Sequence, residues 1–211
     1  MATLESVSQC VINGNLGEVK GQVQSLIDGG SDPLSIITDG LIAGMNVVGA
    51  KFKAGDMFVP AVLMSAQAMA TGVELVKPLI AAEDMPSLGK VVIGTVKGDL
   101  HDIGKNLVGM MLESSGFTVI NVGIDVPPED FIKAAKENNA QIVAMSALLT
   151  TTMLAMKETI DLLVEEGFRE NVKVIIGGAP VSQEFADEIK ADGFAPDAAS
   201  ACDLCKQLLG A

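Results

Sequence analysis

The chain has 211 residues, of which 49% are hydrophobic, enough for one or two domains with a sizeable core. Its net charge of −13 argues against a nucleic-acid partner or an anionic membrane surface, since both require a basic face. No tract of 18 or more residues is free of charged and polar groups, so a membrane-spanning helix is not expected. No basic segment precedes an apolar block at the start, so a secretory signal is not expected either. The chain is therefore predicted to be cytoplasmic.

Residues 1–84 carry apolar side chains at three- and four-residue steps, the spacing of helices. The segment DGGSDP breaks this pattern, with glycines suited to a helix end and with Asp32 and Pro33 suited to the cap and first position of the next helix. A second break at KAGDM precedes a helix expected over 58–82. This part is therefore predicted to be a four-helix bundle.

The segment EDMPSLG at 83–89 is polar and contains proline and glycine, so it is expected to link two domains, 1–84 and 85–211. After it, short β-branched runs alternate with helical patterns. The expected strands are 91–96, 118–123, 141–147 and 172–178, with a short fifth within 193–199. This alternation predicts a flavodoxin-like α/β domain with a five-stranded, doubly wound parallel sheet. Ligands of such folds bind at the carboxyl ends of the strands.

The only histidine, His101, lies in the loop after the first predicted strand, within GDLHDIG. A carboxylate two residues before it, Asp99, can accept a hydrogen bond from one ring nitrogen and leave the other more basic, as for metal-bound imidazole. Gly98 and Gly104 allow a bulky ligand to approach the backbone. The residues alone also permit a merely solvated loop histidine. A zinc site built from one histidine and carboxylates lacks further neutral or soft ligands.

Other motifs give weaker signals. The Walker loop, GxGxxG after the first strand and the GxSxG elbow are absent from the sequence. Cys202 and Cys205 form a CxxC in a predicted helix, without a second pair or a nearby histidine to complete a zinc site, which favours a structural role over a redox pair.

Three loops together resemble a known signature. Asp99-x-His101-x-x-Gly104, Ser146-x-Leu148 and Gly177-Gly178 are similar to the cobalamin-binding pattern DxHxxG…SxL…GG, with spacings that fit it. VKGDLHDIGKNLVG and GAKFKAGDMFVPAVLMSAQAM also resemble the methylcobalamin-binding domains of cobalamin-dependent methionine synthase, over nearly the whole chain. Because barrel domains for methyl donors are missing, the chain resembles the free-standing corrinoid proteins of multicomponent methyltransferase systems.

The resemblance implies roles for individual residues. His101 replaces the cofactor's own base as the lower cobalt ligand, in a base-off, His-on state, and Asp99 bonds its other ring nitrogen. A serine completes this relay in methionine synthase, and Thr152 stands at that position here, which keeps the hydroxyl. The cofactor-binding set implied on this face is Asp99, His101, Asp102, Ile103, Gly104, Ser146, Leu148, Thr150, Thr152, Gly177 and Gly178. Ser146, Leu148 and Thr150 would contact the nucleotide tail, for which the two glycines leave space.

In the bundle, Phe52 and Val59 match the apolar residues that cover the methyl face of the corrin, and helical spacing alone also predicts Phe52 in the bundle core. The implied function is a methyl carrier whose cobalt alternates between cob(I) and methylated cob(III) states. The implied partners are a substrate-specific methyltransferase, a second methyltransferase to an acceptor such as tetrahydrofolate or a thiol, and a reductive activase. Neither nucleic acid nor membrane is expected as a partner.

Three alternatives remain on the sequence. A cobalamin-binding sensor would usually add a DNA-binding module and a basic surface. A subunit of an adenosylcobalamin-dependent isomerase would leave Phe52 and Val59 without a task. A receiver-like domain without a cofactor is expected to end its third strand in aspartate, where Met145, Ser146 and Ala147 stand.

Overall fold

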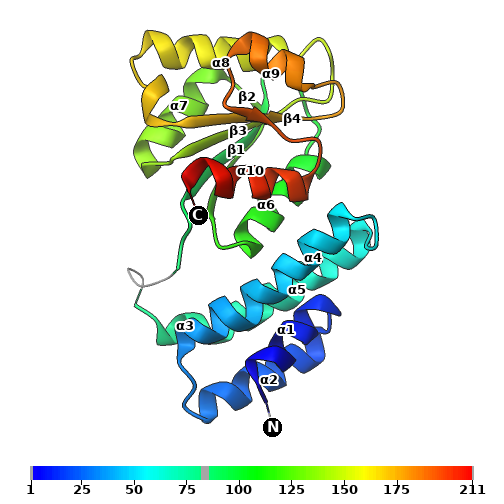
Figure 1. The fold of residues 1–211 in the computed structure, drawn as a ribbon. Helices are drawn as coiled ribbons and strands as arrows, with labels where there is room; N and C mark the ends of the chain where they lie inside the picture. Colours follow the sequence, from blue (N-terminus) through cyan, green and yellow to red (C-terminus); the bar gives the residue numbers. More distant parts are fainter. Residues whose placement is uncertain (1, 82–85, 211) are drawn as a thin grey trace. The chain divides into compact units, whose positions relative to one another are not determined.

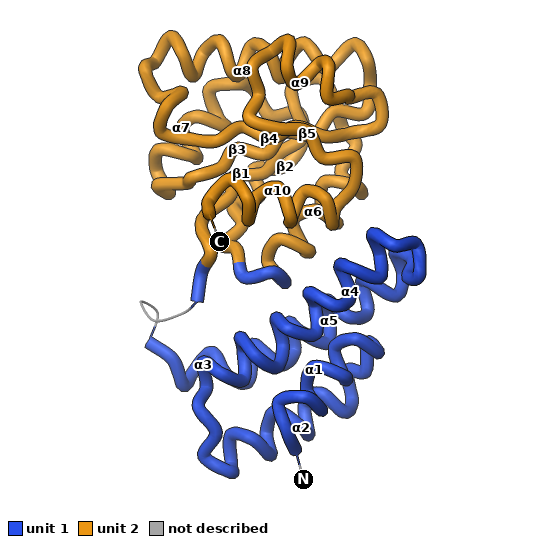
Figure 2. Tube along the Cα trace, in the orientation of Figure 1, with its two compact units in different colours: residues 1–87, 114–116 blue, residues 88–113, 117–211 orange. Residues whose placement is uncertain are grey.

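The computed structural model describes residues 2–81 and 86–210, which divide into two compact units (Figure 2). The first consists of residues 1–87 with 114–116, and the second of residues 88–113 and 117–211. The predicted boundary between residues 84 and 85, and part of the predicted linker, fall on residues 82–85, outside the described residues.

The N-terminal unit is helical (Figure 1). Its elements are α1 (Leu4–Ile12), α2 (Leu16–Asp28), α3 (Pro33–Ser35), a π-helical segment (Ile36–Ile42), α4 (Ala43–Lys53), α5 (Val59–Val76) and a 3₁₀ turn (Lys77–Leu79). As predicted, the side chain of Asp32 caps α3, and Pro33 takes its first position. α1 packs on α2 and α4, and α5 packs on α2 and α4, around fully buried valines at 7, 11, 23, 48 and 62.

The last helix of this unit is shorter than predicted. α5 ends at Val76, a 3₁₀ turn follows, and Ile80 is extended. Pro78 explains the difference, because proline has no N–H to donate to the preceding turn of the helix.

Two helical stretches in this unit, 33–53 and 59–79, are long and apolar enough to cross a membrane by length and composition alone, with mean hydropathies of 1.3 and 1.4. The sequence predicts none, because charged and polar residues interrupt its apolar tracts. Core helices of water-soluble proteins pass the same test, and 39% of each window is buried inside the structure, so the finding is weak evidence for a membrane span.

The C-terminal unit is an α/β sandwich around a five-stranded parallel sheet of order β2-β1-β3-β4-β5, the flavodoxin-like order. Its strands are β1 (Lys90–Val96), β2 (Thr118–Val126), β3 (Ile142–Ser146), β4 (Lys173–Gly177) and β5 (Gly193–Phe194). Its helices are α6 (Ile103–Ser114), α7 (Pro128–Asn138), α8 (Leu154–Glu165), α9 (Gln183–Ile189) and α10 (Ala198–Leu209). The predicted fold class is confirmed.

Helices cover both faces of this sheet (Figure 1). α7, α8 and α9 lie on one face, and α6 and α10 lie on the other. Six consecutive residues of β1 are buried, as expected for a central parallel strand. Gly94 in β1 makes room for the fully buried ring of Phe131 from α7, since a Cβ at Gly94 would lie 2.7 Å from that ring.

The edge strand β2 runs three residues beyond its prediction, to Val126. The sequence of its second half, with Asn121, Gly123 and Asp125, is typical of a loop. The pairing with β1 shifts register twice in this half, so these residues belong to a bulged strand.

A close approach of α1 and α4 gives a test of the bundle. A Cβ at Gly44 would lie 2.7 Å from the backbone oxygen of Ser8 and 2.8 Å from the Cβ of Val11. Gly44→Ala should therefore lower the free energy of unfolding by about 1–3 kcal/mol, measured by urea denaturation. Gly21→Ala is the matched control, because a Cβ in this part of α2 meets nothing within 4 Å. Better helix propensity should stabilise it by about 0.5–1 kcal/mol. If both changes altered the free energy of unfolding equally, the close packing of α1 against α4 at Gly44 would be contradicted.

Candidate functional site

The carboxyl ends of three neighbouring strands form one edge of the sheet, where the sequence predicts a ligand site. Thr95 of β1 pairs with Ser146 of β3, and Ser146 pairs with Gly177 of β4. Because the strands are parallel, the loops after them begin at the same level. The register therefore brings the loop that contains His101 beside the loop that contains Thr152.

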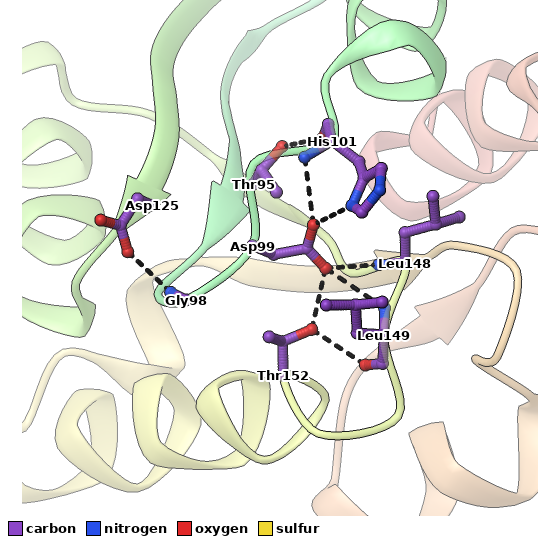
Figure 3. A network of polar contacts seen from close by, with 8 residues as sticks. All are labelled: Thr95, Gly98, Asp99, His101, Asp125, Leu148, Leu149 and Thr152. Carbon is purple, nitrogen blue, oxygen red and sulfur yellow. Dashed lines mark hydrogen bonds and ion pairs between the residues drawn. The ribbon is translucent and has the colours of Figure 1, made fainter.

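Asp99 lies at the centre of this edge (Figure 3). Its side chain has no exposed surface. Oδ1 accepts hydrogen bonds from the backbone N–H of His101 at 3.1 Å and pairs with its ring Nδ1 at 2.7 Å. Oδ2 accepts from the backbone N–H groups of Leu148 at 2.7 Å and Leu149 at 3.2 Å, and from the hydroxyl of Thr152 at 2.8 Å. Residues from two separate loops thus share one carboxylate.

These donors keep Asp99 ionised. Burial by itself raises the pKa of the carboxyl group, because a buried charge loses its hydration. The N–H of Leu148, the ring and N–H of His101 and the hydroxyl of Thr152 outweigh that effect and hold the pKa of Asp99 well below its usual range. The site therefore contains a fixed negative charge under the imidazole.

This charge decides which nitrogen of His101 is available. A carboxylate can only accept, so the neutral ring carries its proton on Nδ1 and its lone pair on Nε2. The described residues form no hydrogen bond to Nε2, and the side chain is 52% exposed. His101 therefore presents an open nitrogen donor on the loop.

The hydroxyl of Thr152 has two acceptors within reach. Its Oγ1 lies 2.8 Å from Oδ2 of Asp99 and 2.9 Å from the backbone oxygen of Leu149, but it has one proton to donate. Thr152 is itself buried. The chain His101–Asp99–Thr152, which the sequence implies only by resemblance, is thus contiguous in the structure.

Three further residues that the sequence analysis does not single out hold this loop. The fully buried Thr95 donates its hydroxyl to the backbone oxygen of His101 at 2.8 Å. Asp125, at the end of β2, accepts from the N–H of Gly98 at 2.6 Å. A lone threonine in the apolar run VVIGTV was the available signal for the first, whereas Asp125 resembles an ordinary loop residue.

Lys105, the third, is almost wholly buried in the first turn of α6. Its Nζ donates to the side-chain oxygens of Asn106 at 2.7 Å and Asn121 at 2.8 Å. Asn106 in turn donates to the carboxylate of Asp102 at 3.0 Å. Burial lowers the pKa of Lys105, and the charge of Asp102 opposes this shift. The cluster ties the residue after His101 to the edge strand β2.

The predicted glycines occupy two kinds of surroundings. A Cβ at Gly104 meets nothing within 4 Å, so space remains beside the loop. Gly177 and Gly178 are constrained by the protein itself. A Cβ at Gly177 would lie 2.9 Å from the backbone oxygen of Ala195, and one at Gly178 only 1.8 Å from that of Ala147. The positive φ of Gly178, 129°, adds backbone strain for any other residue.

The segments around the imidazole expose apolar surface that a ligand could cover. Exposed aliphatic side chains follow the strand ends on both loops, which is an unusual exposure for residues of this type. They are Leu100, Ile103, Leu148 and Leu149. Among the other predicted residues, Ser146 is half-buried, whereas Asp102 and Thr150 are exposed. A nitrogen donor with aliphatic neighbours fits a corrin ring and its cobalt better than a hydrated ion.

The described part of the chain contains no group of three or more histidine, cysteine, aspartate or glutamate side chains able to hold an ion. Cys202 and Cys205 are buried in α10. Burial, and then the charge of Cys202, raises the pKa of the Cys205 thiol to about 12, so a reactive thiolate is disfavoured.

Phe52 and Val59 belong to the helical unit. Phe52 is half-buried near the end of α4, and Val59 begins α5 with 38% of its surface exposed. Their neighbours Phe58 and Leu63 are also exposed. Phe52 is thus not fully buried in the bundle core, and an apolar surface remains on this unit.

The charge of Asp99 should make stability depend on pH. A carboxylate whose folded pKa is depressed stabilises the fold above its ordinary pKa of 3.8, and this contribution is lost as the pH falls below it. Asp99→Asn should lower the free energy of unfolding at pH 7 by about 1–3 kcal/mol, since buried donors lose a charged acceptor. Urea denaturation from pH 7 to pH 3 should show that the difference in free energy of unfolding between Asp99→Asn and wild type becomes smaller as the pH falls. A difference that stayed constant would contradict the assignment.

Known proteins match the chain over both units. The B12 binding domain family matches residues 89–203, and a second B12 binding domain model matches residues 3–77. A corrinoid protein of Desulfitobacterium hafniense is 44% identical over 100% of this chain and 99% of its own length. Dimethylamine corrinoid protein 1 of Methanosarcina acetivorans is 51% identical, with 84% of each chain covered.

Two solved structures are also similar. One is the methanol:cobalamin methyltransferase complex of Methanosarcina barkeri, with a TM-score of 0.88, 34% identity, and coverage of 98% of this chain and 79% of that chain. The other is a cobalamin-binding protein of Desulfitobacterium hafniense, with a TM-score of 0.82, 32% identity and 98% of both chains covered. On its domain matches and its similarity to these relatives, the chain belongs to the family of B12-binding corrinoid proteins.

Proposed function

We propose that this chain is a methyl carrier, a corrinoid subunit that receives a methyl group from a small methylated substrate through one methyltransferase and delivers it through a second. The observation that carries the proposal is the buried Asp99, which directs the only imidazole of a B12-binding chain outward through Nε2. Two of the relatives named above are a dimethylamine corrinoid protein and a methanol:cobalamin methyltransferase complex, which supports a carrier and not a sensor.

His101 is the residue that would ligate cobalt, through Nε2. When bound, the corrinoid supplies a metal centre that accepts and releases a methyl group. Asp99 keeps the proton on Nδ1, so the lone pair of Nε2 stays directed at the ligand. Thr152 would support this arrangement by donating its hydroxyl proton to Asp99.

The remaining predicted residues are assigned to the cofactor's periphery. The exposed Asp102, Ile103 and Gly104 border His101 and would lie along the corrin. Ser146, Leu148 and Thr150 follow the next strand and would line the pocket of the displaced nucleotide tail. Gly177 and Gly178 would border this pocket with their backbone, while the positions of their missing side chains are taken up by Ala195 and Ala147.

Phe52 and Val59 would cover the methyl face of the corrin. Apolar side chains there would exclude water from a reactive metal alkyl. This cover would have to move aside for each partner enzyme, so motion of the helical domain would gate turnover.

The partners follow from the carrier role. A substrate-specific methyltransferase is supported by the related methanol:cobalamin methyltransferase complex. A second methyltransferase, with an acceptor such as tetrahydrofolate or a thiol, and a reductive activase complete the proposed system. We place this soluble chain in the cytoplasm, without a nucleic-acid or membrane partner.

Reconstitution tests the proposal. After incubation with hydroxocobalamin and desalting, the protein should retain about one cobalt per chain and show a base-off, His-on absorption spectrum. His101→Ala should lose that spectrum, because the variant lacks the imidazole that would ligate cobalt. Asn139→Gly, a change at the end of α7 and the amino end of β3, is the control and should bind as wild type does. No retained cobalt in the wild-type protein would remove the carrier function.

The hydroxyl of Thr152 gives a finer test. Thr152→Val keeps the shape but removes the donor to Asp99, and it should weaken binding of hydroxocobalamin about 10-fold or more, as for other partners of a metal-bound histidine. Thr152→Ser keeps the hydroxyl and should stay close to wild type. Equal losses in both variants, measured by equilibrium dialysis, would point to packing and not to the hydroxyl.

A further inference from the structure

Asp125 has an unusual backbone for its place in the fold. Among the described residues, the non-glycine residues with positive φ are Asp125, Asn139 and Lys190. Asn139 and Lys190 end helices α7 and α9, where a left-handed residue is ordinary. Asp125, with a φ of 53°, lies instead inside β2, one residue before its end. Such a conformation costs free energy in a strand, so it requires a compensating interaction.

The irregular pairing of β2 with β1 accompanies this conformation. Ile93 pairs with Asn121, Gly94 with Gly123 and Val96 with Val126, so β2 contains two more residues than β1 over the same length. Bulges of this kind bend a strand and redirect a side chain. Here they direct Asp125 to the loop that follows β1 (Figure 3).

Two hydrogen bonds join Asp125 to that loop. Its Oδ1 accepts from the N–H of Gly98 at 2.6 Å, and its own N–H donates to the backbone oxygen of Asp99 at 3.0 Å. Gly98 is itself left-handed, with a φ of 82°. Asp125 thus holds the backbone on both sides of the Cα of Asp99, and the direction of the Asp99 side chain follows from that backbone.

The other side of Asp99 is held from β3. Leu148, Leu149 and Thr152 donate to its carboxylate from the loop after that strand. In Figure 3, Asp125 lies on the opposite side of the loop from these residues. Asp99 is therefore fixed through its backbone by β2 and through its carboxylate by the β3 loop.

We propose that Asp125 is a positioning residue, which orients Asp99 through the Gly98–Asp99 backbone and thereby fixes the tautomer and direction of the His101 imidazole. The meaning of this role for methyl transfer rests on the function proposed above. The geometry itself concerns only this chain, so it can be tested without a corrinoid.

The test uses the full chain, free of corrinoid, and three variants. Asp125→Gly keeps the left-handed backbone accessible but removes the acceptor. Asp125→Asn tolerates the same backbone and keeps a neutral acceptor. Asn139→Gly is the matched control, a left-handed residue replaced by glycine away from the loop. The single histidine gives one imidazole signal, so its tautomer can be read by long-range ¹H–¹⁵N correlation NMR.

In Asp125→Gly, amide hydrogen exchange at Gly98 should accelerate about tenfold or more, because a hydrogen bond to a charged acceptor is lost. The share of imidazole with its proton on Nδ1 should fall in the same variant. Asp125→Asn should show a smaller change of the same sign in both readouts, and Asn139→Gly should show none.

Unchanged exchange at Gly98 in both Asp125 variants would overturn the proposal. Faster exchange with an unchanged tautomer would also overturn it, since Asp125 would then tether the loop without orienting Asp99. If Asp125→Gly failed to fold, Asp125→Asn would decide alone, with wild-type values in both readouts counting against the role. Failure of wild-type protein to retain cobalt would instead refute the proposed function and leave this result intact.

Discussion

The site depends on one buried charge. Asp99 has no exposed side-chain surface, and its carboxylate is stabilised only because His101, Leu148, Leu149 and Thr152 all donate to it. A buried carboxylate without such donors would take up a proton. Asp99 would then no longer determine which nitrogen of the imidazole is free. The ligand geometry of the single histidine is thus a consequence of how that charge is satisfied.

The parallel sheet makes this arrangement possible. Donors far apart in sequence reach Asp99 because β1 and β3 are adjacent and in register, with Thr95 opposite Ser146. Close backbone contacts keep the strand ends in place. Gly178 is needed where its Cβ would collide with Ala147, and Thr95 fastens the loop through the backbone of His101. The close contact at Gly178 and the hydrogen bond from Thr95 therefore both hold the loops that surround Asp99.

The sequence predicts the layout of the protein well, because its signals are local. The bundle is predicted by helical spacing and by Asp32 with Pro33. The doubly wound sheet is predicted by the alternation of strands and helices, and the family by the motif around His101. The missed features are non-local. The bulges of β2 arise from its pairing with β1, and the left-handed Asp125 cannot be recognised without that pairing. Likewise, the burial of Lys105 depends on Asn121, sixteen residues away.

The most direct test of the account exploits the single histidine. Protein labelled with ¹⁵N only in histidine would be loaded with corrinoid, reduced to the Co(II) state and studied by electron paramagnetic resonance. An axial nitrogen splits each cobalt line into a triplet if it is ¹⁴N and into a doublet if it is ¹⁵N. The account predicts doublets in the labelled protein, with His101 as the lower ligand. Persistent triplets would show that the cofactor's own base remains bound, and would contradict the role assigned to Asp99 and His101.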